Sequence, residues 1–478
     1  MLKMKCKKKL MYSLLSMLLV NSLCFGCGST GQETMAESVS EAGIPESVSL
    51  SDDSADSEVA DSTVSGNMQV DSSAEEIDTV SGNMQVDYEE DLVVEDTRRE
   101  PVKVRGIYVS GPVAGIAKMD DLIELVDQTE LNAMVIDIKN DEGKVTYKMQ
   151  SEQVLEIDAG VGYISDIEEL VARCKEKDIY LIARIVAFRD PYLAEQKPEW
   201  AVHTKSGEIF RDKNGMAWVN PYCREMWDYL VEIAAQAAQV GFDEVQFDYI
   251  RFSTDIGEED VDYGPESDNV SKIEIITEFT EYLYEQLVPQ GVYVAADVFG
   301  TVIDNETDQA IVGQDYVKMA AHLDYICPMV YPSHYHNGSY GISVPDAEPY
   351  RTINAAATAS VQALDAVPEE NRAHVRMWLQ SFTAGWVPGH ISYGPKQIRD
   401  QIKGAYDAGY DEWILWNAAV NYQPRAFLTE EEAEAERLRW DAEKQTVRQE
   451  AEEPKANTEE TEVREAEESE VLQPETAE

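Results

Sequence analysis

Eight short runs rich in β-branched and aromatic residues alternate with helical stretches over residues 100–428. The runs lie at 104–111, 133–140, 180–188, 244–252, 293–300, 324–331, 375–382 and 412–418. Helix-like segments precede several of them, as 224–241 does the fourth run and 395–409 the eighth. Strand–helix alternation predicts a parallel sheet, and eight units in about 330 residues predict a (β/α)8 TIM barrel with enlarged loops.

The alternative fold is a doubly wound α/β sheet. That fold would place a glycine-rich phosphate-binding turn after the first strand, and the segment 109–118, VSGPVAGIAK, supplies no GxGxxG. No other motif in the chain calls for a cofactor, so none is expected. His334 and His336 form an HxH pair without an obvious third ligand, so we expect a polar loop there and no metal site.

The first 27 residues have the pattern of an export signal. Five lysines between positions 3 and 9 precede a 14-residue apolar run at 10–23, which is shorter than the roughly 20 residues of a membrane-spanning helix. Gly26-Cys27-Gly28-Ser29 resembles a bacterial lipobox, although Cys24 and Phe25 depart from it. We expect Cys27 to be lipidated and the protein to be held on the outer face of the cell membrane. Ordinary secretion is the alternative.

Two acidic segments flank the predicted barrel. Residues 28–99 lack helical or strand periodicity and contain TVSGNMQVD twice, which predicts a disordered linker. In the charged tail, 429–478, Thr429 and Glu432 form a candidate capping box for a last helix, and the chain beyond about 450 is expected to be disordered. The formal net charge of −53 argues against nucleic acid as a partner and makes a lipid the expected means of membrane attachment.

Polar side chains gather late in nearly every predicted strand. A TIM barrel brings these strand ends to one face, where the active sites of this fold lie. Because unpaired buried charges are costly, we expect that face to be open to solvent and ligand. The residues concerned are Asp137, Lys139, Arg184, Asp248, Arg251, Asp297, Tyr331, Gln380, Trp416 and Asn417.

Two of these carboxylates, Asp248 and Asp297, belong to the fourth and fifth strands. Period-two alternation places Gln246 and Asp248 on one face of their strand, and Asp297 on the same face as Ala295. Neighbouring carboxylates suit acid–base or nucleophilic cleavage of glycosidic bonds. We expect Arg251 to supply a cation near Asp248, and the apolar neighbours of Asp297 to raise its pKa.

Aromatic residues at strand ends and in loops could stack on sugar rings. The candidates are Tyr331, Tyr335, Trp378, Trp386 and Trp416. No GxSxG serine-hydrolase elbow is present, and no Cys–His pairing stands out.

Taken together, these motifs resemble the putative glycosyl hydrolase domains of unknown function, which are related to TIM-barrel glycosidases. The resemblance covers roughly 102–425 and rests on VRGIYVSG, LNAMVIDIKNDEGKVTY, YLIARIVAFRDP, WVNPYCREMWDYLVEIA, GFDEVQFDYIRFS, AADVFG, YICPMVYPSHYHNGSYG and WLQSF. It implies a polysaccharide-cleaving barrel on the cell exterior.

The fourth strand also resembles those of two glycosidase groups. The chitinase pattern DxxDxDxE is met at Asp243 and Asp248, but Gln246 and Ile250 replace its second acid and its catalytic glutamate. The α-amylase-like pattern fits better and implies a strand-four nucleophile, Asp248. In that group the acid on strand five is a glutamate, and an arginine precedes the nucleophile by two residues. This chain departs from the pattern at both positions, with Asp297 and Gln246.

The sequence thus predicts an extracellular glycoside hydrolase, with Asp248 as nucleophile or base and Asp297 as proton donor. Asp137, Arg184 and Tyr331 are expected to position the sugar, and the other strand-end residues to contribute to binding. The expected partner is a cell-wall glycan or an exopolysaccharide. The alternative is a non-catalytic glycan-binding barrel.

Overall fold

The computed structural model describes residues 98, 100–255, 260–446 and 449. The predicted signal peptide with Cys27 lies outside these residues, as do nearly all of the predicted linker and the tail from 450 onward. No helix in the described ranges combines the length and apolar character needed to cross a bilayer.

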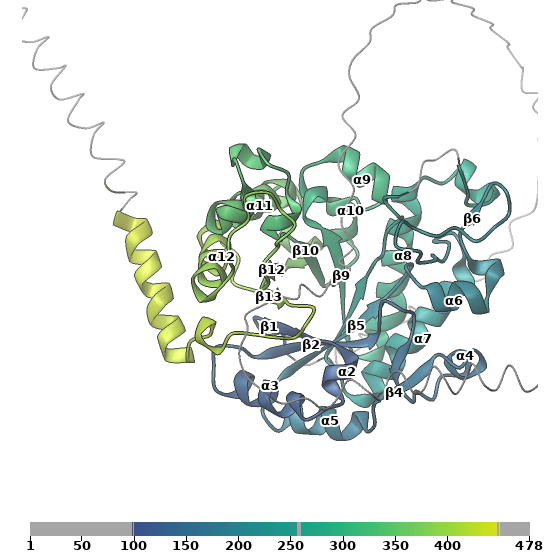
Figure 1. Cartoon of the computed structure of the whole chain (residues 1–478), viewed down its shortest axis with the longest axis horizontal. Coiled ribbons are helices and arrows are strands. Elements are labelled where there is room, and N and C mark those ends of the chain that lie inside the picture. Colours follow the sequence, from purple (N-terminus) through teal and green to yellow (C-terminus); the bar gives the residue numbers. More distant parts are fainter. Residues whose placement is uncertain (1–97, 99, 256–259, 447–448, 450–478) are drawn as a thin grey trace, which may run out of the picture. The chain divides into compact units, whose positions relative to one another are not determined.

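Eight parallel strands close into a barrel (Figure 1). Neighbouring strands pair in the order β1-β13-β12-β10-β9-β7-β5-β2, and β2 pairs with β1 to close the ring. This closure confirms the predicted TIM barrel and excludes the doubly wound sheet, whose edges stay open. The strands are β1 (Arg105–Val109), β2 (Ala133–Lys139), β5 (Tyr180–Val186), β7 (Glu244–Asp248), β9 (Tyr293–Phe299), β10 (Tyr325–Met329), β12 (Met377–Gln380) and β13 (Trp413–Trp416).

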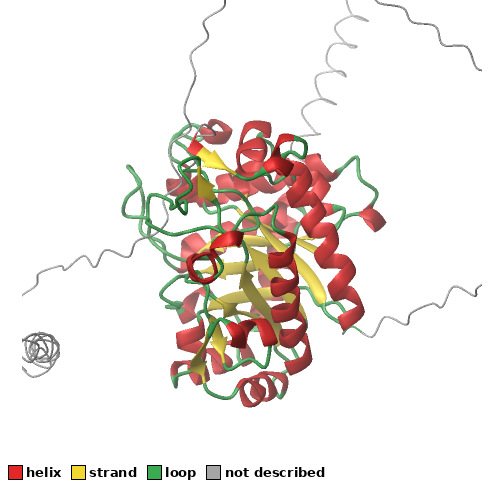
Figure 2. Ribbon diagram, turned by 90° about the vertical axis from the view of Figure 1, so that its right-hand side faces the viewer, coloured by secondary structure: helices red, strands yellow, loops and turns green. Residues whose placement is uncertain are grey.

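Helices surround the barrel strands (Figure 2). The longer ones are α3 (Lys118–Asp127), α5 (Ile167–Lys175), α7 (Arg224–Val240), α8 (Lys272–Leu287), α11 (Pro349–Leu364) and α12 (Pro395–Ala408). In α7 the buried residues Met226, Leu230, Ile233 and Ala237 recur at helical spacing, and Gly241 ends the helix with φ 109°. The left-handed conformation at such a helix end favours glycine, so sequence and geometry agree there.

Shorter elements fill the connections. The helices among them are α2 (Gly111–Ala114), α4 (Glu152–Glu156), α6 (Pro191–Gln196), α9 (Glu306–Val312) and α10 (Tyr316–Ala320). The strands are β3 (Val145–Tyr147), β4 (Gly160–Ile164), β6 (His203–Thr204), β8 (Val261–Asp262) and β11 (His374–Val375). β3 and β4 extend the sheet from the carboxyl end of β2, while β6 and β8 form a separate pair. No clear periodicity in the sequence marks these shorter elements.

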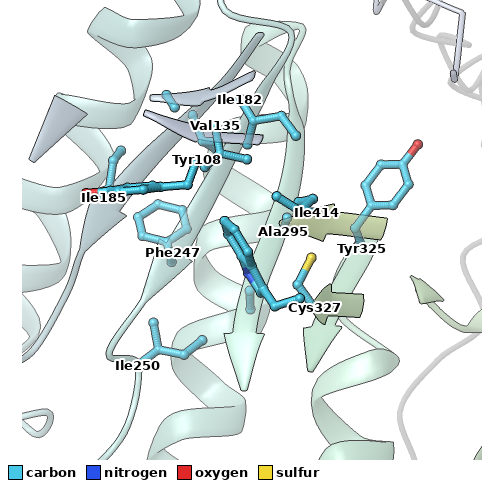
Figure 3. Packing of buried hydrophobic residues seen from close by; sticks show 14 of the residues in the cluster. Tyr108, Val135, Ile182, Ile185, Phe247, Ile250, Ala295, Tyr325, Cys327 and Ile414 are labelled. Atoms are coloured by element: carbon cyan, nitrogen blue, oxygen red, sulfur yellow. The ribbon is translucent and has the colours of Figure 1, made fainter. Parts of the chain in front are cut away.

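Apolar side chains fill the part of the barrel interior that lies before the polar residues at the strand ends. Val135, Ile182 and Ala295 each lie two residues before a polar strand-end residue, so alternation points them to the same side of the sheet. All three are completely buried, and Figure 3 shows them among the side chains packed between neighbouring strands.

A buried ion-pair network closes the amino-terminal end of the barrel. Arg376, directly before β12, donates to Glu244 of β7 at 2.7 Å and to Glu412 at 3.0 Å. Tyr180 donates to the other oxygen of Glu244 at 3.1 Å, and the Arg376 guanidinium lies 3.9 Å from the centre of the Tyr325 ring. Arg376 and Glu244 are fully buried, and burial raises the pKa of Glu244 to about 7 against the opposing charge of Arg376.

The chain leaves the barrel through a helical segment, 430–446, which packs back onto α12. The predicted capping box is present, since Thr429 Oγ1 accepts from the Glu432 amide at 3.3 Å and Glu432 accepts from the Thr429 amide at 3.0 Å. Arg399 of α12 pairs with Glu436 of this segment and with Glu130. Trp440 is buried, 6.0 Å from the Tyr406 ring.

The ion-pair network of Arg376 and Glu244 predicts that removing one charge destabilises the protein more than removing both. Arg376→Met should lower the free energy of unfolding by about 3–5 kcal/mol, because it leaves the buried Glu244 without its cation. The double variant Glu244→Gln/Arg376→Met should lose less, since both charges are gone. Arg351→Ala is the control, because Arg351 pairs with Glu348 while 54% exposed, and it should change stability by less than about 1 kcal/mol. Urea unfolding measures all three, and an Arg376→Met midpoint equal to that of the wild type would contradict the prediction.

Candidate active site

Arg184 of β5 joins two carboxylates inside the carboxyl-terminal end of the barrel. Its Nε and Nη2 donate to Asp248 Oδ2 at 3.0 and 2.6 Å, and its Nη1 donates to Asp137 Oδ1 at 2.7 Å. Arg184 is 1% exposed, so these bonds form in a nearly water-free setting. The strand register explains the meeting, because Arg184 lies opposite both Asp137 of β2 and Gln246 of β7.

Tyr108 of β1 completes the surroundings of Asp137. Its hydroxyl donates to Asp137 Oδ2 at 2.5 Å, so both carboxylate oxygens are used. Burial raises the pKa of Asp137 to about 6, against the opposing charge of Arg184. Burial and the Asp137 charge also raise the pKa of Tyr108, which keeps this phenol a hydrogen-bond donor.

Asp297 of β9 lies in a different electrostatic setting from Asp248. Its Oδ1 accepts from Gln246 Nε2 at 2.7 Å and from Trp378 Nε1 at 2.6 Å, and both donors are neutral. Burial raises the pKa of Asp297 well above its ordinary value, and the negative charge of Asp248 raises it further. The raised pKa of Asp297 agrees with the expectation from the sequence. Its second cause, the charge of Asp248, comes from the neighbouring strand β7.

A left-handed residue ends β7 at the point where the site begins. Tyr249 has φ 54°, and its amide donates to Asp248 Oδ1 at 2.6 Å. Arg189 donates to the Tyr249 hydroxyl at 2.5 Å. The fourth strand was predicted to run to 252, and it stops at Asp248 because Tyr249 cannot continue an extended chain in this conformation. The strained turn fixes the carboxylate at the strand end.

Three expected site residues instead support the loops around the barrel end. Lys139 is completely buried, where it pairs with Asp190 at 2.7 Å and donates to the Val186 carbonyl at 2.6 Å. Gln380 donates to Asp346 and accepts from the Ser333 amide. Asn417 donates to the Ser381 carbonyl and so links two loops. These side chains are engaged within the protein.

Arg251 lies within electrostatic reach of Asp248, although its hydrogen bond goes elsewhere. Its Nη1 donates to the Phe252 carbonyl at 2.9 Å, and its guanidinium lies over the Phe299 ring at 4.4 Å. Burial lowers its pKa to about 10. The cation that pairs with Asp248 is Arg184, two strand positions away in the β5 register, and not the arginine that follows Asp248 in sequence.

Aromatic rings surround the charged groups. Trp416 of β13 is half-buried, with its ring centre 4.1 Å from that of Tyr108 and 5.4 Å from the Arg184 guanidinium. Tyr331 is 6% exposed and meets Phe382 edge to face at 6.0 Å. Trp378 and Tyr335, which we expected to stack on sugars, are buried.

The expectation of an open, solvated ring of charges was wrong for its central members. Asp137, Arg184 and Asp297 are each 2% exposed or less, and Asp248 is 6% exposed. Burial is tolerated because Arg184 pairs with two of the acids and neutral donors satisfy the third. Asp141, with 36% of its side chain exposed, lies 3.4 Å from both Arg184 and Arg189 and extends the network outward.

Several members of this network were not identified from sequence. Tyr108, Asp141 and Arg189 have no spacing that marks them, whereas Gln246 shares the inward face of Asp248 and could have been added by alternation. His334 is half-buried, its Nδ1 lies 3.1 Å from the Ser333 hydroxyl, and removal from solvent lowers its pKa to about 4. In residues 100–255 and 260–446, no group of three or more His, Cys, Asp and Glu side chains has a metal-binding arrangement.

Three solved structures overlap part of the chain, each at a TM-score below 0.5. A hypothetical protein from Ruminiclostridium thermocellum is 37% identical over 40% of this chain and 97% of its own, with a TM-score of 0.37. The PgaB (BpsB) glycoside hydrolase domain from Bordetella bronchiseptica is 14% identical over 66% and 94%, at 0.47. The spore cortex-lytic enzyme SleL from Bacillus megaterium is 12% identical over 68% and 73%, at 0.40.

The family assignment rests on sequence. No curated protein sequence matches the chain significantly. A family model described as "Putative glycosyl hydrolase domain" matches residues 106–422, about two thirds of the chain and nearly the whole barrel. This match confirms the resemblance seen in the strand motifs: the chain belongs to the family of putative glycosyl hydrolase domains.

Proposed function

We propose that this protein is a glycoside hydrolase that cleaves a polysaccharide with two carboxylates, Asp248 and Asp297. The observation that carries the proposal is their contrast in environment on the neighbouring strands β7 and β9. Asp248 is bonded to an arginine, whereas Asp297 receives only neutral donors and has a raised pKa. Pairs of acids held in opposite settings are the hallmark of acid–base machinery on sugars.

Asp248 is the proposed nucleophile or base. Both of its oxygens accept hydrogen bonds, Oδ2 from Arg184 and Oδ1 from the Tyr249 amide, which compensates and orients a carboxylate. Arg184 is therefore proposed as a positioning residue, which extends its expected role of holding the sugar.

Asp297 is the proposed proton donor. A donor must carry its proton at working pH and lose it in the reaction, and a raised pKa meets the first requirement. The two bonds from Gln246 and Trp378 both reach Oδ1. Oδ2 is the oxygen to which we assign the transferable proton.

The strand register favours a retaining mechanism. Gln246 lies opposite Ala295 and Phe247 opposite Ala296, so continuing the register brings Asp248 level with Asp297. Neighbouring strands are about 4.8 Å apart, closer to the carboxyl separation of about 5–5.5 Å in retaining enzymes than to the wider inverting gap. In that mechanism Asp248 attacks the anomeric carbon while Asp297 protonates the departing oxygen, and water then releases the sugar from Asp248.

The carboxylate assignment predicts loss of turnover without loss of binding. Asp248→Asn and Asp297→Asn keep the side-chain shapes, so each should reduce cleavage by at least about 100-fold while glycan affinity stays near that of the wild type. Asp400→Asn is the control and should cleave normally, because Asp400 lies on α12, pairs with Lys396 and has 29% of its side chain exposed. The full chain is incubated with peptidoglycan strands, bacterial exopolysaccharides and plant and host glycans, and new reducing ends are counted.

Two outcomes would count against this assignment. If Asp248→Asn cleaved the glycan at nearly the wild-type rate, Asp248 would be neither the nucleophile nor the base. Binding of a glycan by the wild type with no new reducing ends would support the alternative, a non-catalytic glycan-binding barrel. An inverted anomeric configuration in the first product would make Asp248 a base that activates water.

We further propose that the protein acts outside the cytoplasm, attached to the membrane by lipid on Cys27. Support comes from the lysines, the apolar run and Gly26-Cys27 in the sequence. Cell-wall glycans and exopolysaccharides are the polymers available at that place, and the linker would hold the barrel clear of the membrane.

The attachment proposal predicts that Cys27→Ala moves the protein out of the membrane fraction. Its barrel should unfold at the wild-type temperature, since Cys27 precedes the barrel by about 75 residues. Cys174→Ala, which alters a cysteine of α5, is the control and should remain with membranes. A Cys27→Ala protein that stays in the membrane fraction at wild-type size would show that the cysteine is not the anchor.

A further inference from the structure

The loop that follows β12 exposes a tryptophan. Trp386 is 55% exposed, and among the described residues with exposed large apolar side chains it is the one tryptophan. Its ring stacks on Phe382 with centroids 6.0 Å apart and planes 18° from parallel. One face of the indole is thus backed by Phe382, and the exposure of the residue leaves the other face for solvent or a ligand.

Phe382 connects this tryptophan to the charged centre of the barrel. Phe382 meets Tyr331 edge to face at 6.0 Å, and Tyr331 follows β10 at the carboxyl end of the barrel. The charges of Asp297 and Asp248 contribute, after burial, to the raised pKa of the Tyr331 phenol, so this ring lies within their electrostatic reach. Tyr331, Phe382 and Trp386 thus form a series of ring contacts that leads from the surroundings of the carboxylates to the exposed loop.

The loop is held in place by hydrogen bonds at both of its ends. Gln380 Nε2 donates to Asp346 at 2.9 Å and to the Phe382 carbonyl at 3.1 Å. On the return path, the Ile391 amide donates to Asp346 at 3.3 Å and the Tyr393 amide to Thr383 at 3.0 Å. A fixed, exposed ring loses little conformational entropy when a ligand packs on it.

We infer that Trp386, backed by Phe382, is a platform on which a sugar ring of the substrate stacks, beyond the units bound at Asp248 and Asp297. The inference rests on the proposed hydrolase function and deepens it. A pyranose ring has a flat face of C–H groups that packs well on the indole plane, whereas its hydroxyls stay in water. Because the platform lies at the surface and the carboxylates lie inside, the substrate class is a polymer longer than a disaccharide.

Binding of short and long oligosaccharides tests the platform. The probes are β-linked N-acetylglucosamine oligosaccharides of two and six units and glycan strands of purified peptidoglycan, titrated into the full chain carrying Asp297→Asn so that cleavage does not interfere. Adding Trp386→Ala should weaken binding of the longer probes about 10-fold, which corresponds to about 1.4 kcal/mol, and leave the two-unit probe unchanged. Trp386→Phe should lose less, because a smaller ring remains.

Leu438→Ala is the matched control, since Leu438 is 64% exposed on the segment 430–446, and it should bind like the parent. Equal affinities of Trp386→Ala and its parent for the longer probes would overturn the platform. Cleavage by the otherwise wild-type protein separates the two proposals. If Trp386→Ala weakens glycan binding but the protein cleaves no glycan, only the hydrolase proposal is contradicted. If the protein cleaves long glycans and Trp386→Ala does not change that cleavage, only the platform proposal is contradicted.

Discussion

The carboxyl-terminal end of this barrel depends on one guanidinium, that of Arg184. It donates to Asp137 and to Asp248 in a setting where an isolated charge would cost several kcal/mol. Without that cation, the three carboxylates on β2, β7 and β9 would repel one another inside a parallel barrel. With it, two are compensated, and the third, Asp297, is left beside a negative neighbour and neutral donors. The contrast between Asp248 and Asp297, from which the proposed chemistry follows, is therefore a consequence of where Arg184 points.

Both ends of the barrel contain a buried arginine that bonds to two acidic side chains. At the amino-terminal end, Arg376 lies between Glu244 and Glu412, just as Arg184 lies between Asp137 and Asp248. The network at the amino-terminal end is completely buried at Arg376 and Glu244. The one at the carboxyl-terminal end is bordered by the left-handed Tyr249 and the half-buried Trp416, and by Asp141, whose side chain is partly exposed. An arginine between two acids is therefore not by itself the mark of an active site.

Much of the fold could be predicted from the sequence, because strand and helix periodicity survive in single segments. All eight barrel strands were located, and alternation placed Asp248 and Gln246 on the interior face. Contacts between strands could not be predicted in the same way. Arg251 follows Asp248 closely in the chain and lies within its electrostatic reach, yet the arginine that bonds to Asp248 is Arg184, which the β5–β7 register brings there. Lys139 has the spacing of a site residue, but its partner Asp190 lies on a loop whose path no local pattern reveals.

The most direct test is the protonation state of Asp297 in the resting protein. Infrared difference spectra of the full chain at neutral pH, compared between the wild type and Asp297→Asn, report the carbonyl stretch of a protonated carboxyl group. We expect a protonated band in the wild type that Asp297→Asn abolishes and that persists to a pH well above the ordinary range for aspartate. Asp137→Asn should leave that band in place. A wild-type spectrum without a protonated carboxyl at neutral pH, or a band that Asp297→Asn leaves unchanged, would contradict the assignment of Asp297 as the proton donor.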